Sequence, residues 1–353
     1  MNSSKYWSEM FISTDSDPQS REIIISKEEP VKYTEDRPII FSHITPEDYQ
    51  EVSDFYKTHN KMSSGNTTLL TPSDIAKYLS LDNFSVIIRS IKEKLMGSVI
   101  SINLPIRVDK EVIYHGCTTF LTVHSSIRKH GICMVLIRKL TELGFHREIF
   151  CSYYTIPFKL GDNSISVECY YRPILLTKCR ELGFVYPDCY DIRMNTKNRL
   201  LYTVKKPPNF SFRKADIDSL EYYRKVIGNK RFVFYPDEKL WKQFIELFPT
   251  YLISRDDNVV GIVSINTVHC EMSNGIKGKI AMPIICNGNT QLIMEILPTI
   301  VCDHDVLYVY CCGDITKEIL EKFHFIKTSN PVWFSLYNNR INLDIRDLSV
   351  PIL

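Results

Sequence analysis

The clearest pattern of hydrophobic and polar residues lies between Phe120 and Phe145. Apolar residues recur at helical spacing in its second half, at Ile132, Val135, Leu136, Leu140 and Leu143. This spacing predicts an amphipathic helix that buries one face, with Gly144 as its stop. The residues before the helix, Arg128 to Gly131, are basic and follow an apolar run. The stretch therefore predicts a strand, a basic loop and a helix.

The basic loop is a candidate anion site. The first N–H groups of a helix have no partner within the helix, the positive end of the helix dipole lies there, and a glycine lets a ligand approach the backbone closely. The other interpretation is an ordinary strand-to-helix connection with solvated basic side chains. The spacing of Arg128, Lys129, His130 and Gly131 does not by itself decide between the two.

Apolar runs and turn residues predict the other elements of the first half. They are a strand and a helix within 39–60, a hairpin from Asn83 to Val108, strands at Glu111–Val123 and Ile149–Ile156, a helix around Arg172–Leu182, and a strand from Phe184 to about Met194. Residues 1–36 are mostly polar but carry the pair Tyr6–Trp7. We expect this segment to be an arm laid over the body of the protein.

The second half repeats the order of elements of the first. The matching segments are 209–229 with 39–60, Thr250–Asn266 with Phe84–Asn103, and 318–328 with 175–187. Three matches in register favour a duplication, with a boundary near Lys205–Pro208. The counterpart of the basic loop, Asn287–Thr290, has no basic residue. If the loop binds phosphate, we therefore expect only the first half to do so.

Composition narrows the function classes. The 353-residue chain is 44% hydrophobic and 24% charged, as ordinary globular proteins are. A net charge of +2 argues against nucleic acid as a partner. No apolar run approaches the roughly 20 residues of a membrane span. The eleven cysteines lack any CxxC pair, so we expect reduced thiols, no metal site and a cytoplasmic protein.

The order of elements resembles that of the GNAT acyltransferases. The turn Arg128–Cys133 (RKHGIC) resembles the R-x-x-G-x-G/A phosphate loop of that fold, with Cys133 at the last small position. The resemblance is closer to the N-myristoyltransferase family, which has two fused GNAT-like halves and the sequence E-I-N-F-L-C-V-H before its basic loop. Here His115–His124 reads HGCTTFLTVH, which keeps the F-L pair at Phe120–Leu121. The resemblance extends over essentially the whole chain, although only the stretch around Phe120–Ile137 is specific by itself.

The resemblance implies an α+β fold of tandem GNAT-like halves, related by a pseudo-twofold axis around a mixed β-sheet. It divides the chain into an arm (1–36) that contributes to the acyl-CoA site, an acyl-CoA-binding lobe (37–205) and a peptide-binding lobe (206–353). The implied activity is that of a glycylpeptide N-tetradecanoyltransferase, which transfers myristoyl from myristoyl-CoA to the α-amine of an N-terminal glycine. Myristoyl-CoA is then a co-substrate, no cofactor is bound permanently, and we expect a monomer.

The resemblance also assigns residues to roles. The backbone of Phe120 and Leu121 would hold the developing oxyanion, and the carboxylate of Leu353 would be the general base. The acyl-CoA contacts would come from Lys5, Tyr6, Trp7, Phe120, Leu121, Thr122, Val123, Arg128, Lys129, Gly131, Ile132 and Cys133. Thr155 and Tyr171 would contact the peptide. The apolar tail at 344–353 could bury and so place the Leu353 carboxylate, whereas an exposed terminus is the alternative that the residues alone favour.

Departures from the family pattern gather on the peptide side. A histidine of the family is replaced by Tyr171, a glycine is lost at Ile156–Pro157, and an acidic contact is lost at Tyr308–Cys311. Three alternatives therefore stay open. They are an active N-myristoyltransferase with altered peptide preference, an acyl-CoA-binding protein that has lost catalysis, and a GNAT acetyltransferase that acts on another amine.

Overall fold

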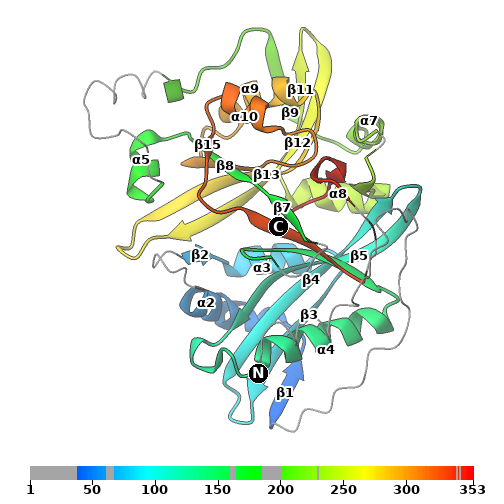
Figure 1. The fold of residues 1–353 in the computed structure, drawn as a ribbon, viewed down its shortest axis with the longest axis vertical. Helices are drawn as coiled ribbons and strands as arrows, with labels where there is room; N and C mark the ends of the chain where they lie inside the picture. The colour runs from blue at the N-terminus through cyan, green and yellow to red at the C-terminus, as the bar shows by residue number, and fades with distance from the viewer. Residues whose placement is uncertain are drawn as a thin grey trace.

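A computed structural model describes residues 38–60, 67–159, 164–184, 201–228, 230–338, 341 and 343–353. These residues form two β-sheets with helices around and between them (Figure 1). The expected arm at 1–36 lies outside the described residues, as does nearly all of the strand expected at 184–194.

The first sheet has the strand order β1-β3-β4-β5-β6-β16-β7; β10 joins it by pairing with β4, and β17 pairs with β10. Its strands are β1 (Ile39–Ser42), β3 (Asn83–Ser90), β4 (Leu95–Val108), β5 (Glu111–Val123), β6 (Cys151–Ile156), β7 (Ile165–Val167), β10 (Phe232–Phe234), β16 (Val332–Tyr337) and β17 (Leu348–Ser349). Helix α4 (Ile132–His146) covers one face, where Ile132, Val135, Leu136 and Leu140 are buried. The predicted apolar stripe of this helix is confirmed.

The second sheet has the order β15-β8-β14-β13-β12-β11-β9, with β2 paired to β12. Its strands are β2 (Thr67–Leu69), β8 (Cys169–Pro173), β9 (Phe210–Lys214), β11 (Thr250–Arg255), β12 (Asn258–Glu271), β13 (Lys277–Gly288), β14 (Val306–Tyr310) and β15 (Ile326–Lys327). Helices α9 (Thr290–Ile300) and α10 (Lys317–Lys322) pack on one face and close a second hydrophobic cluster.

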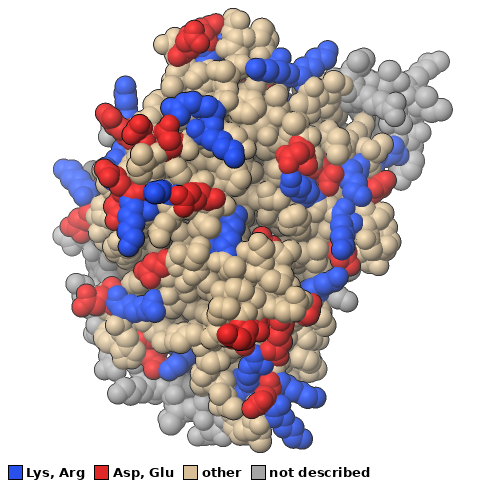
Figure 2. Space-filling view, turned by 180° about the vertical axis from the view of Figure 1, so that it is seen from behind, with Lys and Arg blue, Asp and Glu red and all other residues tan. Residues whose placement is uncertain are grey.

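A central core joins the two sheets. Helices α2 (Tyr49–His59), α3 (Pro72–Leu79), α7 (Ser219–Val226) and α8 (Glu238–Leu247) supply it, together with strands of both sheets and the tail at 343–353. The short helix α5 (Leu176–Glu181) belongs to a separate, smaller cluster. On the face shown in Figure 2, Lys and Arg are interspersed with Asp and Glu and form no single basic patch.

The predicted internal repeat is confirmed. In each half three antiparallel strands lead into a helix, and the strand after the helix pairs in parallel with the third strand: β3-β4-β5-α4-β6 in one and β11-β12-β13-α9-β14 in the other. The matching glycines have the same function. A Cβ on Gly97 would lie 2.8 Å from a Leu136 carbon of α4, and one on Gly261 would lie 2.5 Å from an Ile293 carbon of α9. Both glycines let a helix approach its sheet closely.

The two halves also exchange strands. β8, from the first half of the sequence, pairs with β14 of the second sheet, and β16, from the second half, pairs with β6 of the first. Each sheet is thus completed by the other half of the chain. The expected division into lobes at 205/206 stays a prediction.

Two local predictions were wrong. The helix expected around Arg172–Leu182 covers only Leu176–Glu181, because Arg172 lies in the buried strand β8. Helix α4 continues two residues beyond Gly144 to His146. Gly144 is needed for space, since a Cβ there would lie 2.8 Å from the backbone oxygen of Ile149.

Candidate active site

A β-bulge interrupts the pairing of β4 with β5 at the Phe120–Leu121 pair. Ser98 pairs with Thr122 and Ile100 with Thr119, so Phe120 and Leu121 together face one residue of β4. Phe120 has a positive φ of 54°. A bulge takes the backbone groups of its extra residue out of the ladder of hydrogen bonds. These backbone groups are therefore candidates to bind a ligand.

Aromatic rings form a wall beside the bulge. The ring of Phe120 packs against Tyr78 of α3, with centroids 4.9 Å apart, and against Tyr56 of α2 at 5.8 Å. The Tyr78 hydroxyl is fixed in turn by Asn266 of β12, whose Nδ2 donates to it over 3.0 Å. The bulge thus lies where first-half helices meet the second sheet. By contrast, the side chain of Leu121 is 36% exposed.

The tail brings Leu353 to the same place. Leu348, Val350 and Ile352 are buried, so the apolar positions of the tail are anchored in the central core. Thr119, the residue before the bulge, donates its hydroxyl to the terminal oxygen of Leu353 over 3.3 Å. Leu353 itself is half-buried and packs against the central core, whereas the residues alone favoured an exposed terminus.

Two further side chains fix the tail from β5 and β6, and the sequence did not reveal them. The Tyr153 hydroxyl donates to the Pro351 carbonyl over 3.0 Å, and the Cys117 thiol lies 4.0 Å from the same oxygen. Complete burial raises the pKa of Cys117 to about 12, so it remains a neutral thiol. Thr119, Tyr153 and Cys117 lack any sequence signal, because only the long-range path of the tail gives them their partners.

The basic loop leads from the bulge into α4. After the 3-10 turn Ser125–Ile127, Lys129 and Gly131 take positive φ values of 70° and 82°, and Gly131 is the N-cap of α4 without a side-chain cap. The first-turn N–H groups at Gly131 to Cys133 therefore have no side-chain acceptor from the cap residue. Burial raises the pKa of Cys133 to about 11, which excludes a ready thiolate at that position.

Two side chains of this loop region also hold the protein itself together. Arg128 donates to the backbone oxygens of Val123 and His59, and so ties the loop to the end of α2. The rings of His59 and His124 pack at a tilt, with centroids 4.1 Å apart and an interplanar angle of 40°. The Nδ1 of His124 accepts from the backbone N–H of Ser126 over 3.3 Å. The His124 ring therefore helps to shape the turn before the loop.

The predicted peptide contacts lie in different sheets. Thr155 is in β6, opposite Phe334 of β16. Tyr171 is in β8, buried to 5% exposure, with its ring 5.0 Å from that of Phe184. Tyr171 belongs to the small cluster around α5, whereas Phe120 and Leu353 pack with the central core. The acyl-CoA contacts expected from Lys5, Tyr6 and Trp7 lie outside the described residues.

Among the residues with described positions, no group of three or more His, Cys, Asp or Glu side chains could hold a metal ion. No helix in the described part of the chain is long and apolar enough to cross a membrane.

Part of this chain is similar in sequence to N-myristoyltransferases. Residues 75–167 match the family model "Myristoyl-CoA:protein N-myristoyltransferase, N-terminal domain". A glycylpeptide N-tetradecanoyltransferase of Plasmodium falciparum is 28% identical over 133 residues, which are 36% of this chain and 32% of that protein. The sequence match thus spans about a third of the length of this curated relative.

The structural match covers nearly the whole of both chains. A crystal structure of Saccharomyces cerevisiae N-myristoyltransferase with bound myristoyl-CoA superposes with a TM-score of 0.81 at 15% identity, over 100% of this chain and 99% of that one. A second structure of the yeast enzyme gives a TM-score of 0.75 at 15% identity, over 93% and 87% of the two chains. The fold is therefore α+β with tandem GNAT-like halves. Residues 75–167 also match the N-myristoyltransferase model in sequence, so the fold and this part of the chain both resemble that family.

Proposed function

We propose that the protein transfers myristoyl from myristoyl-CoA to the α-amine of an N-terminal glycine. The observation that carries this proposal is the meeting of the tail with the bulge, since Leu353 lies against Thr119 and the bulge follows at Phe120–Leu121. In this proposal the Leu353 carboxylate lies next to backbone groups that the bulge takes out of the sheet ladder. Acyl transfer to an amine needs such a pair, a proton acceptor and a site for the oxyanion.

The loop before α4 holds the phosphates of the co-substrate in this proposal. The backbone N–H groups of Gly131, Ile132 and Cys133 belong to the start of α4, where the helix dipole adds partial positive charge. Lys129 supplies a full charge beside them. Arg128 has a double role, because it also fixes the loop to α2 through the His59 carbonyl. The backbone of Thr122 and Val123 pairs with the pantetheine arm, which directs the thioester to the bulge.

The reaction is a direct transfer. The carboxylate of Leu353 takes a proton from the glycine ammonium, whose pKa is about 8, and leaves a neutral amine. The amine nitrogen attacks the thioester carbonyl carbon, and the N–H groups of Phe120 and Leu121 stabilise the negative oxygen. The carbon–sulfur bond then breaks, CoA leaves as the thiolate, and the second proton lost by the new amide nitrogen passes to that thiolate, which gives the free CoA thiol. Cys117 and Cys133 are poor candidates for a covalent nucleophile, because burial raises the pKa of both thiols. Direct transfer does not need one.

Transfer of labelled myristate to a panel of peptides tests the activity. Peptides that begin with glycine should be acylated, whereas the same peptides beginning with alanine or with an acetylated glycine should not. Excess myristoyl-CoA should also raise the Tm, because a ligand that binds only the folded state stabilises it. Stabilisation without transfer to any peptide would refute catalysis and favour an acyl-CoA-binding protein. Transfer from acetyl-CoA in preference to myristoyl-CoA would favour the acetyltransferase alternative.

Extension of the tail tests the proposed base. Three residues added after Leu353 move the carboxylate away from Thr119, and we expect kcat to fall by about 10² or more, which is the usual contribution of a general base. The matched control carries the same three residues at the N-terminus. An extended protein with unchanged kcat would exclude the Leu353 carboxylate as the base, although the transfer activity itself would still stand.

A further inference from the structure

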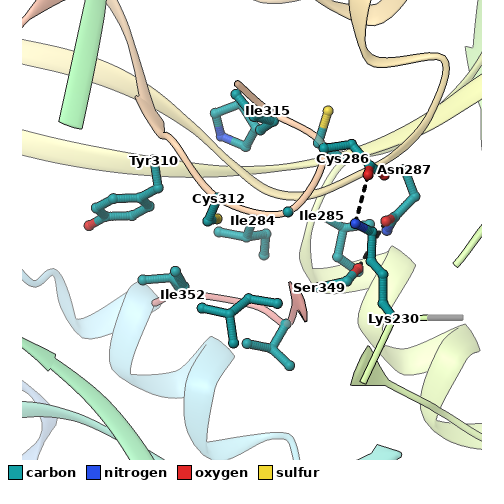
Figure 3. A pocket seen from close by; sticks show the side chains of 15 residues that line it. Lys230, Ile284, Ile285, Cys286, Asn287, Tyr310, Cys312, Ile315, Ser349 and Ile352 are labelled. Atoms are coloured by element: carbon teal, nitrogen blue, oxygen red, sulfur yellow. Dashed lines mark hydrogen bonds and ion pairs between the residues drawn. The ribbon is translucent and has the colours of Figure 1, made fainter. Parts of the chain in front are cut away.

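A cavity lies along the side of the tail that faces the second sheet (Figure 3). Its apolar lining comes from Ile284 of β13, Ile315 after β14, and Val350 and Ile352 of the tail. Close packing normally fixes the position of a buried segment, and a void removes the contacts on one side. Packing alone therefore holds this side of the tail loosely, and other contacts must define where the tail lies.

Polar contacts at the rim of the cavity fix the position of the tail. Lys230 donates from Nζ to the backbone oxygen of Arg346 over 3.2 Å and to Asp314 Oδ1 over 2.7 Å. Ser349 donates its hydroxyl to Asn287 Oδ1 over 2.9 Å. Figure 3 shows the Lys230 and Ser349 side chains on the same rim. These contacts reach the tail a few residues before Leu353.

Lys230 is the charged member of this set. Its side chain is only 13% exposed, whereas that of its partner Asp314 is 45% exposed. The ion pair orients the ammonium, and the backbone oxygen of Arg346 receives a charge-assisted hydrogen bond, which is stronger than a neutral one. β10 begins at Phe232 and pairs in parallel with Leu348, so the chain around Lys230 contacts the tail at two points.

The loop after β14 holds the tail from the other side. The N–H of Gly313 donates to the Ile345 oxygen over 3.0 Å. A Cβ on Gly313 would lie 2.6 Å from the Leu348 oxygen, and the residue has a φ of 62°. The tail therefore fits against this loop in a single register, and Lys230 holds the loop and the tail together through Asp314 and Arg346.

We propose that Lys230 is a positioning residue for the reaction: it clamps the tail at Arg346 to the loop at Asp314, and thereby sets where the Leu353 carboxylate lies beside the bulge. This inference rests on the proposed function, because it needs the carboxylate to act as the base. Misplacing a catalytic group by about 1 Å can cost up to about 10² in rate, so loss of the clamp reaches the chemistry without any contact to substrate.

Steady-state kinetics of Lys230→Met, Lys230→Arg and the control Lys239→Met test the proposal. Methionine keeps the apolar stem but removes the charge, and Lys239 is an exposed lysine at the start of α8. We expect Lys230→Met to lower kcat about tenfold, with the peptide KM and the Kd for myristoyl-CoA within twofold of the parent. Lys230→Arg should retain at least half of kcat, and Lys239→Met should match the parent.

A double-mutant cycle with the tail extension separates positioning from general destabilisation. If Lys230 acts only through the carboxylate, Lys230→Met should have no further effect on the residual rate of the extended protein. An equal tenfold loss in both backgrounds would overturn the proposal. Asp314→Asn provides a second variant should Lys230→Met fold poorly, and it should lower kcat with Tm unchanged within a few degrees.

The outcomes also separate this inference from the proposed function. If the extension abolishes turnover but Lys230→Met and Asp314→Asn have the parent kcat, the carboxylate is the base and the clamp is irrelevant. If the extension leaves kcat unchanged, the proposed base is wrong, and the inference falls with it.

Discussion

The buried ring of His115 predicts a specific loss of stability in acid. His115 is in β5 with 0% exposure, its Nδ1 lies 3.0 Å from the Ile113 oxygen, and its ring packs edge-on against Phe232 at 5.2 Å. Burial lowers the pKa of His115 to about 4 from an ordinary value of about 6.5. Between these two values the unfolded chain binds a proton that the folded protein does not, so the free energy of unfolding falls as the pH falls.

The size of the effect follows from the two pKa values. The contribution of His115 is complete above about pH 6.5 and is lost as the pH falls to about 4. Each pKa unit corresponds to about 1.4 kcal/mol, which gives about 3 kcal/mol over the whole range and about 2 kcal/mol by pH 5. The loss by pH 5 is therefore large compared with a typical stability of about 5–15 kcal/mol.

Urea unfolding of the parent and of His115→Gln at pH 7.5 and pH 5 measures this contribution. Glutamine does not titrate, so the parent should lose about 2 kcal/mol more than the variant between the two pH values. The comparison cancels the carboxylates that titrate in both proteins. A variant whose free energy of unfolding depends on pH in parallel with the parent would refute the assignment of this loss to His115.

Three further substitutions probe the site. Gly131→Ala forces a side chain into a φ of 82°, which costs about 1–2 kcal/mol, and should weaken myristoyl-CoA binding about tenfold in a titration; an unchanged Kd would count against the loop as the phosphate site. Tyr153→Phe removes the donor to the Pro351 oxygen and should lower the free energy of unfolding by about 1–3 kcal/mol in urea titrations, so a loss below about 0.5 kcal/mol would contradict the contact. Thr119→Val removes the donor to Leu353 and should lower kcat at least tenfold while the Kd for myristoyl-CoA stays unchanged; equal losses in both would point to a general distortion.

Local sequence patterns predicted the parts of the fold that depend on local interactions. The helical spacing at Ile132–Leu143 gave α4, because one face of that helix is buried against β3 and β4. The repeated glycines Gly97 and Gly261 marked equivalent positions, because both allow a helix to pack closely. These signals work because neighbouring residues share one face of one element.

The strand exchange could not be predicted in the same way. Cys169–Pro173 is buried throughout and pairs with β14, more than a hundred residues later in the chain. A short, fully buried strand has no alternation of polar and apolar residues that distinguishes it from a buried helix segment. The same run was therefore predicted to begin a helix at Arg172. Its partner strand also has no local mark, because pairing at long range depends on the whole topology.

The candidate site likewise has parts that local sequence patterns reveal and parts that they do not. The basic loop and the Phe120–Leu121 pair were identified from the sequence, since loop and pair lie next to each other in it. The residues alone did not predict where the tail docks, because the surfaces that receive its four apolar residues come from distant parts of the chain. Thr119 and Tyr153 become site residues only once the tail lies against them.

The difference between the two repeated helices explains why one fold with two similar halves would use a single phosphate site. At the start of α9, the Asn289 side chain accepts from the Leu292 N–H over 3.2 Å and so occupies the end of the helix. At the start of α4, the N-cap is Gly131, which offers no side-chain acceptor. Both halves have a helix that begins after a strand of the sheet, but Gly131 leaves the start of α4 without a side-chain acceptor, and Lys129 lies two residues before it in the sequence. The second half uses its equivalent end for its own stability. A capped helix gains about 1 kcal/mol from its side chain, whereas an open one can bind a charged ligand instead.

Replacing Gly131 with asparagine would therefore give α4 its own side-chain acceptor and should weaken co-substrate binding more than alanine does, since the cap competes with the phosphate for the same N–H groups.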